Sequence, residues 1–587
     1  MELTAIINKI NSFLWGVPLL ILLLGGGVYL SIKLGFPQIH ILKIMKKTVF
    51  TLFKKESSES DSLSQFQTFS TALAATVGTG SVVGVGECIR IGGAGSVFWM
   101  WVSAFFGMGL AYCENYLGVR CSDGKLCGAA SYLEKIGRTK LTAVLFAVFT
   151  VGASLGMGNM VQTGSAAAAA REGFGIPSYI FALVVLIFVF LVAVGKNSAA
   201  CLCEKLVPIM AVLFIGGSLE VIIFHPLKAA GAIAMIVKNA FCPTACITGS
   251  VAGTIIFSMV EGLKRGAFSN EAGLGSTVAV HSSCEIKSPE LQGTWAMAEV
   301  FIDTFVICTL TAVVIIISGT DLTGEDMAVR AYNAALGGAG KYFMSGSLIL
   351  FALATVAGWF FIGERAWRYL FPRSDMIYRI MAIACGCIGT MWSMELVWGV
   401  SDIFNGLMAV PNVIGVLVLW RKEVGMRSEE LRYRLRRLIF VENRFYCRKI
   451  ASLFSFFSFL TSLSSPNTLS PFAPSYSHHT DNKSFPQAYQ ADTAVLPNGL
   501  ESHGDKDSAV LSLLRPRRQN AYSANAVDNR QNHHFSHLLK LRLLLIQQNL
   551  ILEQWQEEPQ LPPMVSLLQA VPTAMPNQRR ISSLPPP

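Results

Sequence analysis

The chain has 587 residues, of which 52% are hydrophobic and only 14% are charged, and its formal net charge is +10. Soluble domains carry about a quarter charged residues, so this composition argues against a soluble protein. The Lys and Arg residues cluster between long apolar runs. Cytoplasmic loops therefore explain the positive charge better than binding to nucleic acid does.

Apolar runs of roughly 18 to 25 residues recur along the first part of the chain, and this length crosses a hydrocarbon core of about 30 Å. The sequence predicts an all-α polytopic membrane protein with eleven transmembrane helices. No small-residue cleavage site closes the run from Phe13 to Leu34, so we expect a helix there rather than a signal peptide. The predicted spans lie near residues 13–34, 66–87, 95–117, 142–168, 178–195, 205–224, 250–283, 295–318, 345–365, 376–395 and 402–420.

Basic residues gather in the loops after the first, third, ninth and last predicted spans, whereas the alternate loops are poorer in them. The positive-inside rule then places the N-terminus outside the cell and the C-terminus in the cytoplasm. The basic positions that decide this orientation are Lys43, Lys46, Lys47, Lys54, Lys55, Arg120, Lys125, Lys135, Arg138, Lys140, Arg365, Arg368, Arg373, Arg421, Lys422 and Arg427.

The ten spans after the first divide into two groups of five, residues 66–224 and 250–420, and each group begins with a span that glycines interrupt. Because five is an odd number, the second group enters the membrane from the opposite face, which predicts an inverted repeat. Residues 1–35 would form one extra N-terminal transmembrane helix. Residues 425–587 are rich in polar residues and proline, and we expect a disordered cytoplasmic tail. The tail is either a regulatory extension or the product of a shifted reading frame.

The first interrupted span contains Gly78, Gly80 and Gly84, with Thr79 and Ser81 between them. A helix facing lipid cannot tolerate such a break, because its freed amides and carbonyls would lack partners. In a cavity, freed amides at a helix start suit a carboxylate, and freed carbonyls suit Na⁺ or an ammonium group. The alternative is that these glycines only let helices pack closely.

The second interrupted span reads Ser269-Asn270-Glu271, followed by Gly273 and a further glycine. An Asn–Glu pair in the middle of a span is costly unless it faces protein or water. Paired breaks in corresponding spans of two halves are the best sequence pointer to a transporter's binding site.

Three carboxylates within predicted spans need a counter-charge or a proton. Lys264 and Arg265 precede Glu271 by one to two helical turns and could neutralise it, and Glu271 is then either a structural or gating partner or an ion ligand. Glu299 and Asp303 are four residues apart on one helical face. They belong either to a structural ion-pair network or to a transport site, and we favour the network.

Two further predicted spans, 142–168 and 345–365, carry polar or aromatic side chains that could line a binding site. Asn159 and Gln162 are three residues apart and so share one helical face, where they would form a pocket wall or an interhelical hydrogen bond. Thr355 could offer a hydroxyl to a cation and Trp359 could narrow a pocket, or both could belong to the core.

Enzymatic chemistry is not indicated, because the sequence has no nucleophile–base pair, phosphate loop or metal-ligand spacing. We accordingly expect no cofactor. Cys242 and Cys246 flank Pro243 in a loop that we place outside the cell, where a disulfide is one option.

Several of these stretches together match motifs of a known family. They are residues 71–80, 98–102, 158–162, 268–276 and 299–304, and Gly358-Trp359 followed by Gly363-Glu364. In these strings the chain resembles the alanine or glycine:cation symporters, also called sodium:alanine symporters. The likeness covers about residues 13–420 and excludes the tail.

The resemblance implies a leucine-transporter-like fold of five-plus-five inverted helices with one extra N-terminal helix. The implied activity is Na⁺-coupled uptake of alanine or glycine, and H⁺ coupling is an alternative. The expected partners are the amino acid, Na⁺ and the lipid of the plasma membrane (the inner membrane of a bacterium), with no nucleic acid and no obligate protein partner. A channel or facilitator would also use glycine-lined breaks, and a sensor with a transporter fold would bind the amino acid without carrying it.

The resemblance also implies roles for residues at matching positions. Thr79, Gly80 and Ser81 would meet the substrate carboxylate, and the aromatic side chains of the pocket would restrict the substrate to a small side chain. We expect the substrate site to comprise Thr79, Gly80, Ser81, Asn159, Gln162, Phe268, Ser269, Gly273 and Trp359. The ion site would comprise the carbonyls of Ala74 and Val77 with Thr355, and the gating or structural charges would be Glu271, Glu299 and Asp303.

The chain departs from the family pattern at two positions. The family usually has asparagine where this chain has Ser81, and serine or threonine where it has Ala354. Ser81 has a shorter reach and no amide, so a ligand to substrate or ion would be lost or replaced by water. Ala354 removes a hydroxyl next to Thr355.

Overall fold

The computed structural model describes residues 2–53, 62–122, 128–136, 140–195, 198–241, 251–320 and 327–424. Within these ranges the regular structure is helical, with one isolated parallel bridge between Leu63 and Cys284. The chain divides into two units after Asn467, and all described residues lie in the first unit. The Cys242–Cys246 pair and the expected tail at 425–587 lie outside the described residues.

The helices before the second interrupted span are α1 Glu2–Leu14, α2 Val17–Leu34, η1 Pro37–His40, α3 Ile41–Thr48, η2 Val49–Phe53, α4 Gln65–Thr76, η3 Thr79–Ser81, α5 Val83–Gly92, α6 Ser96–Cys121, α7 Ala130–Leu133, α8 Leu141–Leu155, η4 Gly156–Val161, α9 Gln162–Phe174, α10 Ser178–Val194, α11 Ser198–Phe224 and α12 Pro226–Phe241. Those that follow are α13 Val251–Asn270, α14 Val278–His281, α15 Pro289–Val300, η5 Phe301–Cys308, α16 Thr309–Ser318, α17 Met327–Leu336, α18 Gly338–Leu370, α19 Asp375–Gly389, α20 Met394–Leu419 and η6 Trp420–Val424.

The described helices account for up to eight membrane spans by length and composition. Seven are continuous, and the eighth is the pair α4 and α5, whose axes bend by 56° at the first break. The other three predicted spans fall on α10, α13 and α19. Helix α10 has 17 residues and α19 has 15, so both are short for a full crossing. Helix α13 carries the charged residues Glu261, Lys264 and Arg265.

The N-terminal span is longer than predicted, because α1 and α2 together run from Thr4 to Leu34. The predicted helix began only at residue 13. Two hydrogen bonds hold α1 along α20: the Asn11 amide donates to the Gly399 carbonyl (2.7 Å), and the Trp15 indole donates to the Asp402 carbonyl (2.9 Å). Contacts with α20 therefore stabilise helical structure before residue 13, where the apolar run of the sequence begins.

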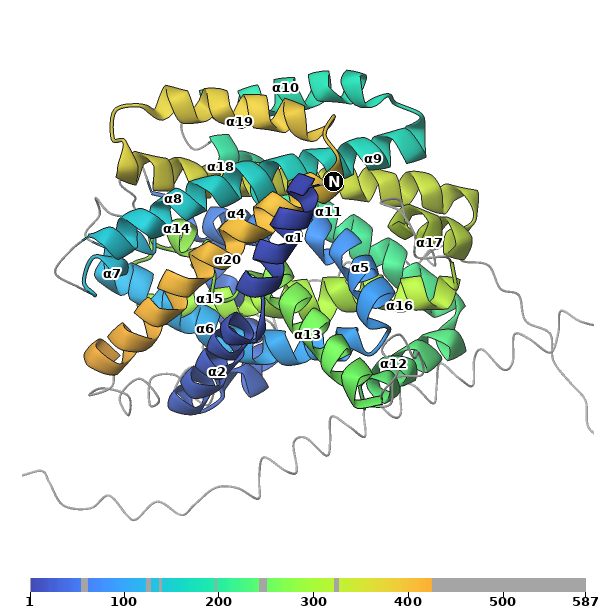
Figure 1. Ribbon diagram of the computed structural model, residues 1–587, viewed down its shortest axis with the longest axis horizontal. Helices are drawn as coiled ribbons and strands as arrows, with labels where there is room; N and C mark the ends of the chain where they lie inside the picture. The colour runs from blue at the N-terminus through green and yellow to red at the C-terminus, as the bar shows by residue number, and fades with distance from the viewer. Residues whose placement is uncertain are drawn as a thin grey trace, which may run out of the picture. The chain divides into compact units, whose positions relative to one another are not determined.

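The long helices form a bundle in which helices far apart in sequence lie side by side (Figure 1). Helix α6 packs on α13 and α15, α18 packs on α8, α9, α11 and α4, and α10 packs on α19. Small residues permit these approaches. A Cβ on Gly262 of α13 would collide with the Ser96 carbonyl oxygen, and one on Gly293 of α15 would lie 2.8 Å from the Tyr112 ring.

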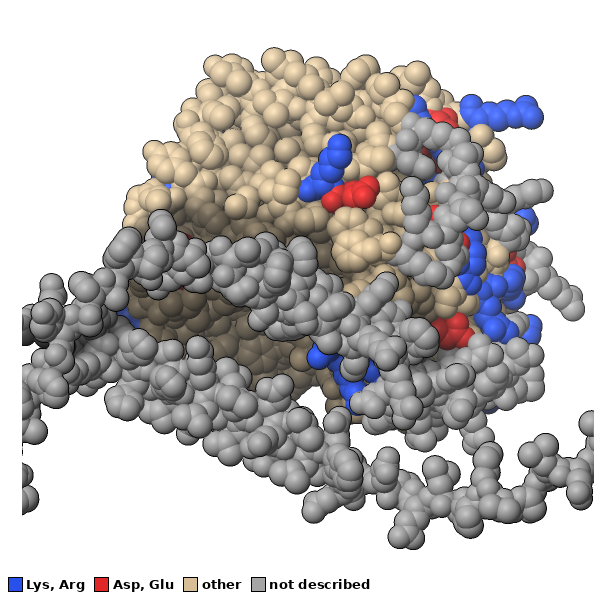
Figure 2. All heavy atoms as spheres, turned by 180° about the vertical axis from the view of Figure 1, so that it is seen from behind, with Lys and Arg blue, Asp and Glu red and all other residues tan. Residues whose placement is uncertain are grey.

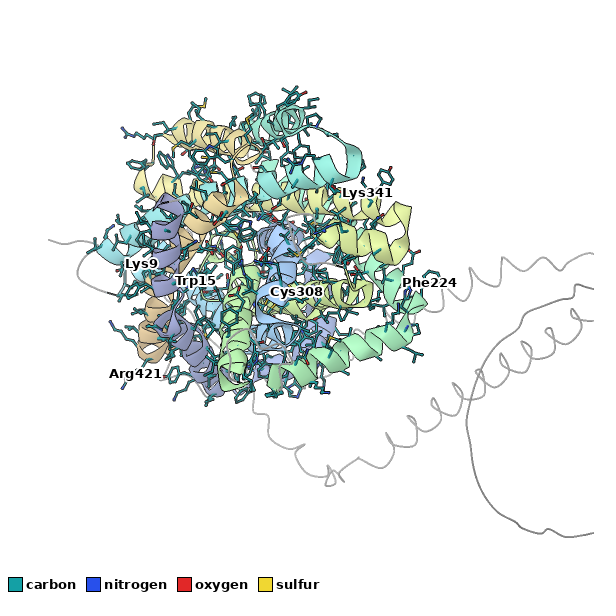
Figure 3. The ribbon with its side chains drawn as sticks, turned by 45° about the vertical axis from the view of Figure 1, so that its right-hand side comes forward. Lys9, Trp15, Phe224, Cys308, Lys341 and Arg421 are labelled. Carbon is teal, nitrogen blue, oxygen red and sulfur yellow. The ribbon has the colours of Figure 1, made fainter. Side chains whose placement is uncertain are left out.

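The surface is that of a protein surrounded by lipid. Figure 2 shows a face on which charged side chains are few and the basic ones gather toward one edge. Large apolar side chains are freely exposed, and Phe224, for instance, is 71% exposed. In Figure 3 Cys308, the last residue of the π-helical segment η5, lies near the middle of the bundle, with Arg421 and Phe224 toward opposite sides.

Candidate functional site

The first break unwinds the chain between α4 and α5. A capping box at Ser64 starts α4, which ends at Thr76. Gly78 is extended, with φ −126° and ψ −159°, and a single turn, η3, leads into α5. A Cβ at Gly78 would lie 2.7 Å from the Thr355 hydroxyl oxygen, so this position needs glycine for the close approach of α18.

Neutral polar groups hold the first break. The Gln162 side-chain oxygen accepts from both the Thr79 amide (3.1 Å) and the Thr79 hydroxyl (2.9 Å). The Thr355 hydroxyl donates to the Val77 carbonyl at 3.3 Å. The Phe268 ring covers Gly80, where a Cβ would lie 3.7 Å from the ring. Of the residues predicted from the sequence, these contacts bring Thr79, Gly80, Gln162 and Phe268 together, and Val77 with Thr355.

Ala74, the third residue expected at the ion site, is fully buried in the last turn of α4. Its position one turn before Val77 leaves its carbonyl near the end of the helix, where intrahelical partners run out. Ala354 precedes Thr355 on α18, and its carbonyl accepts from the Cys203 thiol at 3.7 Å.

The second break follows α13 and has a different backbone. Gly273 and Gly275 have φ values of +90° and +72°, a region that glycine occupies at no steric cost. Glu271 has φ +55°, which for a side chain other than glycine costs of the order of 1–3 kcal/mol. The contacts of its carboxylate must therefore hold Glu271 in place.

The Glu271 carboxylate links the two breaks. One oxygen accepts from the Ser276 hydroxyl at 2.6 Å, and the other accepts from the Trp359 indole N–H at 3.0 Å. The same indole nitrogen lies 3.2 Å from the Ala75 carbonyl in α4. Trp359, which is fully buried, thus connects the second break to the helix that precedes the first.

Neither Lys264 nor Arg265 neutralises Glu271, contrary to one of the sequence expectations. Lys264 is 3.8 Å from Asp402, and Arg265 is 3.0 Å from Glu261. At 1.5 Å per residue, Arg265 lies about 9 Å before Glu271 along the helix, and Glu271 has already left the helical path. The two basic residues line a cavity beside the middle of α13.

The two amides expected on one face point in different directions. Gln162 faces the first break, but the Asn159 amide donates to the Ala382 carbonyl of α19 at 2.7 Å. The reason is the π-helical segment η4, whose wider turns change the angle between positions three apart. Asn159 thus makes the interhelical hydrogen bond that the sequence left open as one of its two roles. Gln162 meets the first break, and its place in a pocket wall stays a prediction.

Glu299 and Asp303 likewise belong to separate networks, because the π-helical segment η5 begins between them. The two Glu299 oxygens lie 3.1 and 3.2 Å from the Nε2 atom of the buried His281. Asp303 accepts from the hydroxyls of Ser81 (2.5 Å) and Ser269 (2.9 Å). The favoured ion-pair network thus holds for Glu299, whereas Asp303 has no Lys, Arg or His partner among the described residues.

Sequence reasoning missed a buried carboxylate that supports the second break. Glu114 of α6 accepts from the Gly273 amide (3.4 Å) and from the Asn412 side-chain amide (2.8 Å). Asn412 also donates to the Gly273 carbonyl at 2.9 Å and accepts from the Tyr132 hydroxyl. Gly273 therefore shapes the break through contacts with α6 and α20. A signal was available, because Glu114 lies in an apolar span, where an ionisable residue marks a functional site by default.

The start of α4 is tied to the segment that follows α14. The Gln292 amide donates to the Gln65 side-chain oxygen at 2.7 Å. The Leu63 backbone pairs with the Ser283 carbonyl (3.0 Å) and the Glu285 amide (2.8 Å). These contacts close the bundle at the end of α4 distant from the break.

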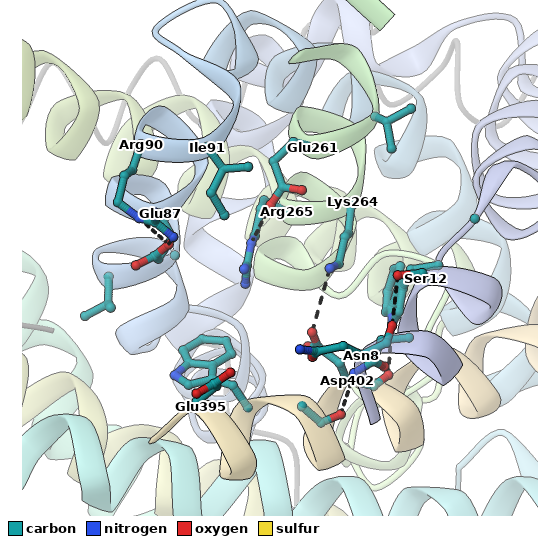
Figure 4. Close-up of a pocket in the computed structure, with 18 of the residues that line it drawn as sticks. Asn8, Ser12, Glu87, Arg90, Ile91, Glu261, Lys264, Arg265, Glu395 and Asp402 are labelled. Carbon is teal, nitrogen blue, oxygen red and sulfur yellow. Dashed lines mark hydrogen bonds and ion pairs between the residues drawn. The ribbon is translucent and has the colours of Figure 1, made fainter. Parts of the chain in front are cut away.

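A cavity of about 760 Å³ lies between α1, α5, α13 and α20 (Figure 4). None of the residues that line it belongs to the closed end formed by Gln65 and Gln292. The Trp398 ring lines it, and its centroid is 5.3 Å from that of the tilted Phe268 ring, which covers Gly80. The cavity therefore leads to the first break, and we call it the vestibule. Its charged lining residues are Glu87, Arg90, Glu261, Lys264, Arg265, Glu395 and Asp402.

A helical membrane protein in which two interrupted helices meet at a buried polar site has the construction of a secondary transporter. Ser81 of the first break and Ser269 beside the second are 188 positions apart in sequence, yet their hydroxyls are in contact. The chain belongs to the sodium:alanine symporter family, which its residues 1–432 match. This match confirms the resemblance seen in the sequence.

Individual relatives agree with the family. The sodium/alanine symporter AgcS of Methanococcus maripaludis is 39% identical over 437 residues, which cover 71% of this chain and 95% of the relative. The probable sodium/glutamine symporter GlnT of Bacillus subtilis is 32% identical, covering 70% and 88%. Among solved structures, MhsT in complex with L-phenylalanine covers 65% of this chain and all of MhsT, with 13% identity and a TM-score of 0.46.

Proposed function

We propose that this chain carries a small neutral amino acid, alanine or glycine, into the cell together with Na⁺. The observation that carries the proposal is the pair of interrupted helices that meet below the vestibule at Thr79, Gly80 and Phe268. Freed amides at the start of α5 suit a substrate carboxylate. The Phe268 ring, which covers Gly80, would restrict the substrate to a short side chain, and this favours alanine and glycine.

The contacts of Thr355 support a Na⁺ site beside the substrate. Its hydroxyl already reaches the Val77 carbonyl at 3.3 Å, and the carbonyl of Ala74 belongs to the same helix end. Carbonyl and hydroxyl oxygens are the ligands that hard cations prefer, and the negative end of the α4 dipole faces them. Na⁺ bound there would hold α18 against the first break.

We further propose a five-plus-five inverted repeat, residues 66–224 and 250–420, with α1 and α2 as the extra N-terminal span. Helix packing supports the pairing. Helices α6 and α15, α8 and α18, and α10 and α19 pack against each other, and each would be its partner's counterpart in the other half. The contacts of α11 with α18 and of α20 with α8 would be exchanged by the same symmetry.

The side of the membrane to which the vestibule opens determines the order of steps in the proposed transport cycle. We propose that the vestibule faces the outside, as the basic loops predict, while the Gln65–Gln292 contact closes the inner side. Na⁺ and substrate binding would close the vestibule above the two breaks and release the inner contacts. The membrane potential contributes about 2.3 kcal/mol per charge for each 100 mV.

The test is uptake of labelled alanine by purified protein in liposomes, with an inward Na⁺ gradient or with choline in its place. We expect uptake that requires Na⁺, and accelerated exchange when unlabelled alanine is inside, which a channel would not give. Uptake that ignores Na⁺ and follows a pH gradient would favour proton coupling. Uptake that ignores both would contradict the proposal.

A matched pair of variants at Thr355 sharpens the test. T355S keeps the hydroxyl and T355V keeps the shape without it. We expect T355S to retain Na⁺-dependent uptake, and T355V to need at least tenfold more Na⁺, about 1.4 kcal/mol of lost binding. Equal Na⁺ dependence in both variants would remove Thr355 from the ion site.

A further inference from the structure

A row of buried polar side chains lies at the closed end of the bundle, and we call it the His281 network. It consists of Gln65 of α4, His281 of α14, and Gln292 and Glu299 of α15. Each of the four is at most 1% exposed. The Nδ1 atom of His281 lies 2.8 Å from the Gln292 side-chain oxygen. Its Nε2 atom lies 3.1 and 3.2 Å from the two Glu299 oxygens. The proposed transport cycle uses only the Gln65–Gln292 contact of this network.

Hydrogen bonding fixes the orientation of the Gln292 amide. Its nitrogen donates to the Gln65 side-chain oxygen at 2.7 Å and to the Ile286 carbonyl at 3.2 Å. A backbone carbonyl only accepts, so the atom that faces Ile286 must be the amide nitrogen. The Gln292 oxygen therefore faces His281, and an amide oxygen can only accept. It follows that the Nδ1 atom of His281 carries a hydrogen.

The other ring nitrogen of His281 then needs a proton between itself and Glu299. A neutral imidazole with its hydrogen on Nδ1 has a lone pair on Nε2. That lone pair would face an ionised carboxylate at 3.1 Å in a buried site, and two acceptors that face each other without water are costly. One proton removes the conflict, whether it resides on His281 or on Glu299. The pair then has no net charge, which a buried site tolerates best.

Other charged groups near His281 do not take the place of this proton. Helix α14 packs on α4, α6 and α18, and α4 has no charged residue. The further titratable or charged groups around α14 are Glu114 of α6, Arg365 of α18, and Cys284 and Lys287 of the following segment. The Lys287 ammonium donates to a backbone carbonyl at 2.8 Å, and the Arg365 guanidinium lies over an aromatic ring. Glu114 has the same sign of charge as Glu299. Within the described residues His281 is thus the ion-pair partner of Glu299.

We infer that the His281 network is a binding site for one proton from the cytoplasm, and that this proton holds the inner end of the transporter closed. The inference rests on the proposed function, which makes this end the inner gate, and it adds a ligand that controls the gate. When the inner end opens, water reaches the pair and the proton passes to water. A neutral imidazole and an ionised carboxylate remain, so the net charge of the network falls by one unit.

The network is placed to act on the helix that precedes the first break. Gln65 is the first residue of α4. The backbone of Leu63, just before it, pairs with the segment directly after α14 at 3.0 and 2.8 Å. Loss of the proton leaves His281 and Glu299 as two facing acceptors, and their repulsion separates α14 from α15. The hydrogen bonds of Gln65 and Leu63 are then lost, which releases the start of α4.

The direction of the pH dependence follows from the two states. The closed state holds the proton, whereas a hydrated histidine, with a pKa of about 6.5, releases it above that pH. Opening at about pH 7 to 8.5 therefore releases up to one proton, and each unit of cytoplasmic pH favours the open state by up to about tenfold. Below about pH 6 the open state keeps the proton too, and the dependence disappears.

Cys284 reports whether the network is closed. Its side chain is buried, and its thiol donates to the Gln65 side-chain oxygen at 3.4 Å, so alkylation requires opening. The experiment treats the purified full-length protein in detergent with N-ethylmaleimide, without Na⁺ or amino acid, from about pH 6 to about pH 8.5. Peptide mass spectrometry gives the alkylation rate of Cys284 relative to the exposed Cys201, which corrects for the effect of pH on thiol reactivity. Cys113, buried in α6, should stay unmodified, and this excludes global unfolding.

In the wild type we expect the relative rate to rise at least tenfold from about pH 6.5 to about pH 8.5. In E299Q the introduced amide donates to the Nε2 atom of His281, so the network closes without a proton. The rate in E299Q should therefore be low at every pH. A purely structural ion pair predicts the opposite, an open network in E299Q. E87Q, the same change at a vestibule carboxylate, is the matched control and should keep the wild-type dependence.

H281Q removes the ring that titrates and leaves Glu299 without its partner, so its alkylation should be rapid at every pH. A wild-type rate that does not change with pH would overturn the inference. An E299Q rate that rises with pH, or that is high throughout, would overturn it as well.

The alkylation assay needs no transport, so it separates this inference from the proposed function. A rate independent of pH, together with Na⁺-dependent alanine uptake, would overturn the proton site and leave the proposed function intact. Opening that depends on pH in the wild type but not in E299Q, without Na⁺-dependent uptake, would support the proton site and contradict the proposed function. Uptake driven by external acid in the wild type and lost in E299Q would mean that the pair carries protons across the membrane, which overturns a cytoplasmic site.

Discussion

The two interrupted helices solve the same problem with different chemistry. The backbone of the first break meets neutral partners, the Gln162 amide and the Thr355 hydroxyl, and only its Ser81 side chain meets a carboxylate, that of Asp303. The second is held by carboxylates, Glu271 within it and Glu114 from α6. Both breaks are buried, so each freed backbone group needs a partner.

The difference reflects backbone geometry. The first break is extended at Gly78 and returns to a helical turn at once, so its free backbone groups are few, and neutral side chains such as Gln162 and Thr355 meet them. The second contains three residues with positive φ, Glu271, Gly273 and Gly275. A longer excursion needs stronger acceptors, and hydrogen bonds to charged groups contribute about twice as much as neutral ones. We therefore expect the second break to be more sensitive to substitution.

The largest effect is expected at Glu271. E271G suits the positive φ but removes both carboxylate contacts, and each such bond contributes about 1.5–3 kcal/mol. Alanine uptake in liposomes should fall about 100-fold or more in E271G and about tenfold in E271Q, which keeps one acceptor. E395Q, which alters an exposed vestibule carboxylate, is the control and should stay within about twofold. A mild effect of E271G would show that the carboxylate does not hold the break.

The second prediction distinguishes the roles of two side-chain amides, Asn159 in η4 and Gln162 in α9. Q162A leaves the Thr79 amide and hydroxyl without their acceptor, so KM for alanine should rise at least tenfold. N159A removes a contact to α19 and should lower thermal stability without changing KM. Both are measured by uptake kinetics and thermal unfolding in detergent. A rise in KM with N159A as large as with Q162A would contradict the separation.

The third prediction concerns Glu114 of α6, which supports the second break from a neighbouring helix. In E114Q the new amide group meets a donor, either the Gly273 N–H or the Asn412 amide, because Glu114 accepts from both. The cost should be about 1–3 kcal/mol, seen as a lower temperature of thermal unfolding and a severalfold loss of uptake. E87Q, at the exposed pair with Arg90, should change stability by less than about 0.5 kcal/mol. Equal stability of E114Q and wild type would show that the break does not depend on this carboxylate.

The smallest effect is expected in the vestibule. The Lys264 ammonium nitrogen is 3.8 Å from the Asp402 carboxylate, too far for a hydrogen bond, and Lys264 lines the open vestibule, so we expect their attraction to contribute about 0–1 kcal/mol although Asp402 is buried. K264Q should therefore change KM less than about fivefold, and the difference should shrink at high salt. A loss of tenfold or more, independent of salt, would mean that the pair acts as a gate.

The sequence located both breaks in the correct segments. Gly78 to Ser81 and Glu271 to Gly275 depart from the helix as expected. Helix interruption depends on glycine and on the cost of unpaired backbone groups in lipid, and both are local properties. The long helices α6, α11 and α18 were equally readable from their apolar runs.

The sequence could not tell which carboxylate meets which partner. Equal spacing suggested that Asn159 and Gln162, and likewise Glu299 and Asp303, act together, yet each pair is divided between two networks. In both cases a π-helical segment changes the register, and tertiary contacts rather than local composition decide where such a segment forms.

The chain by itself therefore determined the membrane class, the family and the location of the two breaks. Apolar length, glycine and charge act over a few neighbouring residues and can be read along the sequence. Only the tertiary structure decided that Trp359 joins Glu271 to Ala75 and that Ser81 and Ser269 meet at Asp303. Such contacts join atoms from distant helices, whose facing sides depend on crossing geometry and close packing throughout the bundle.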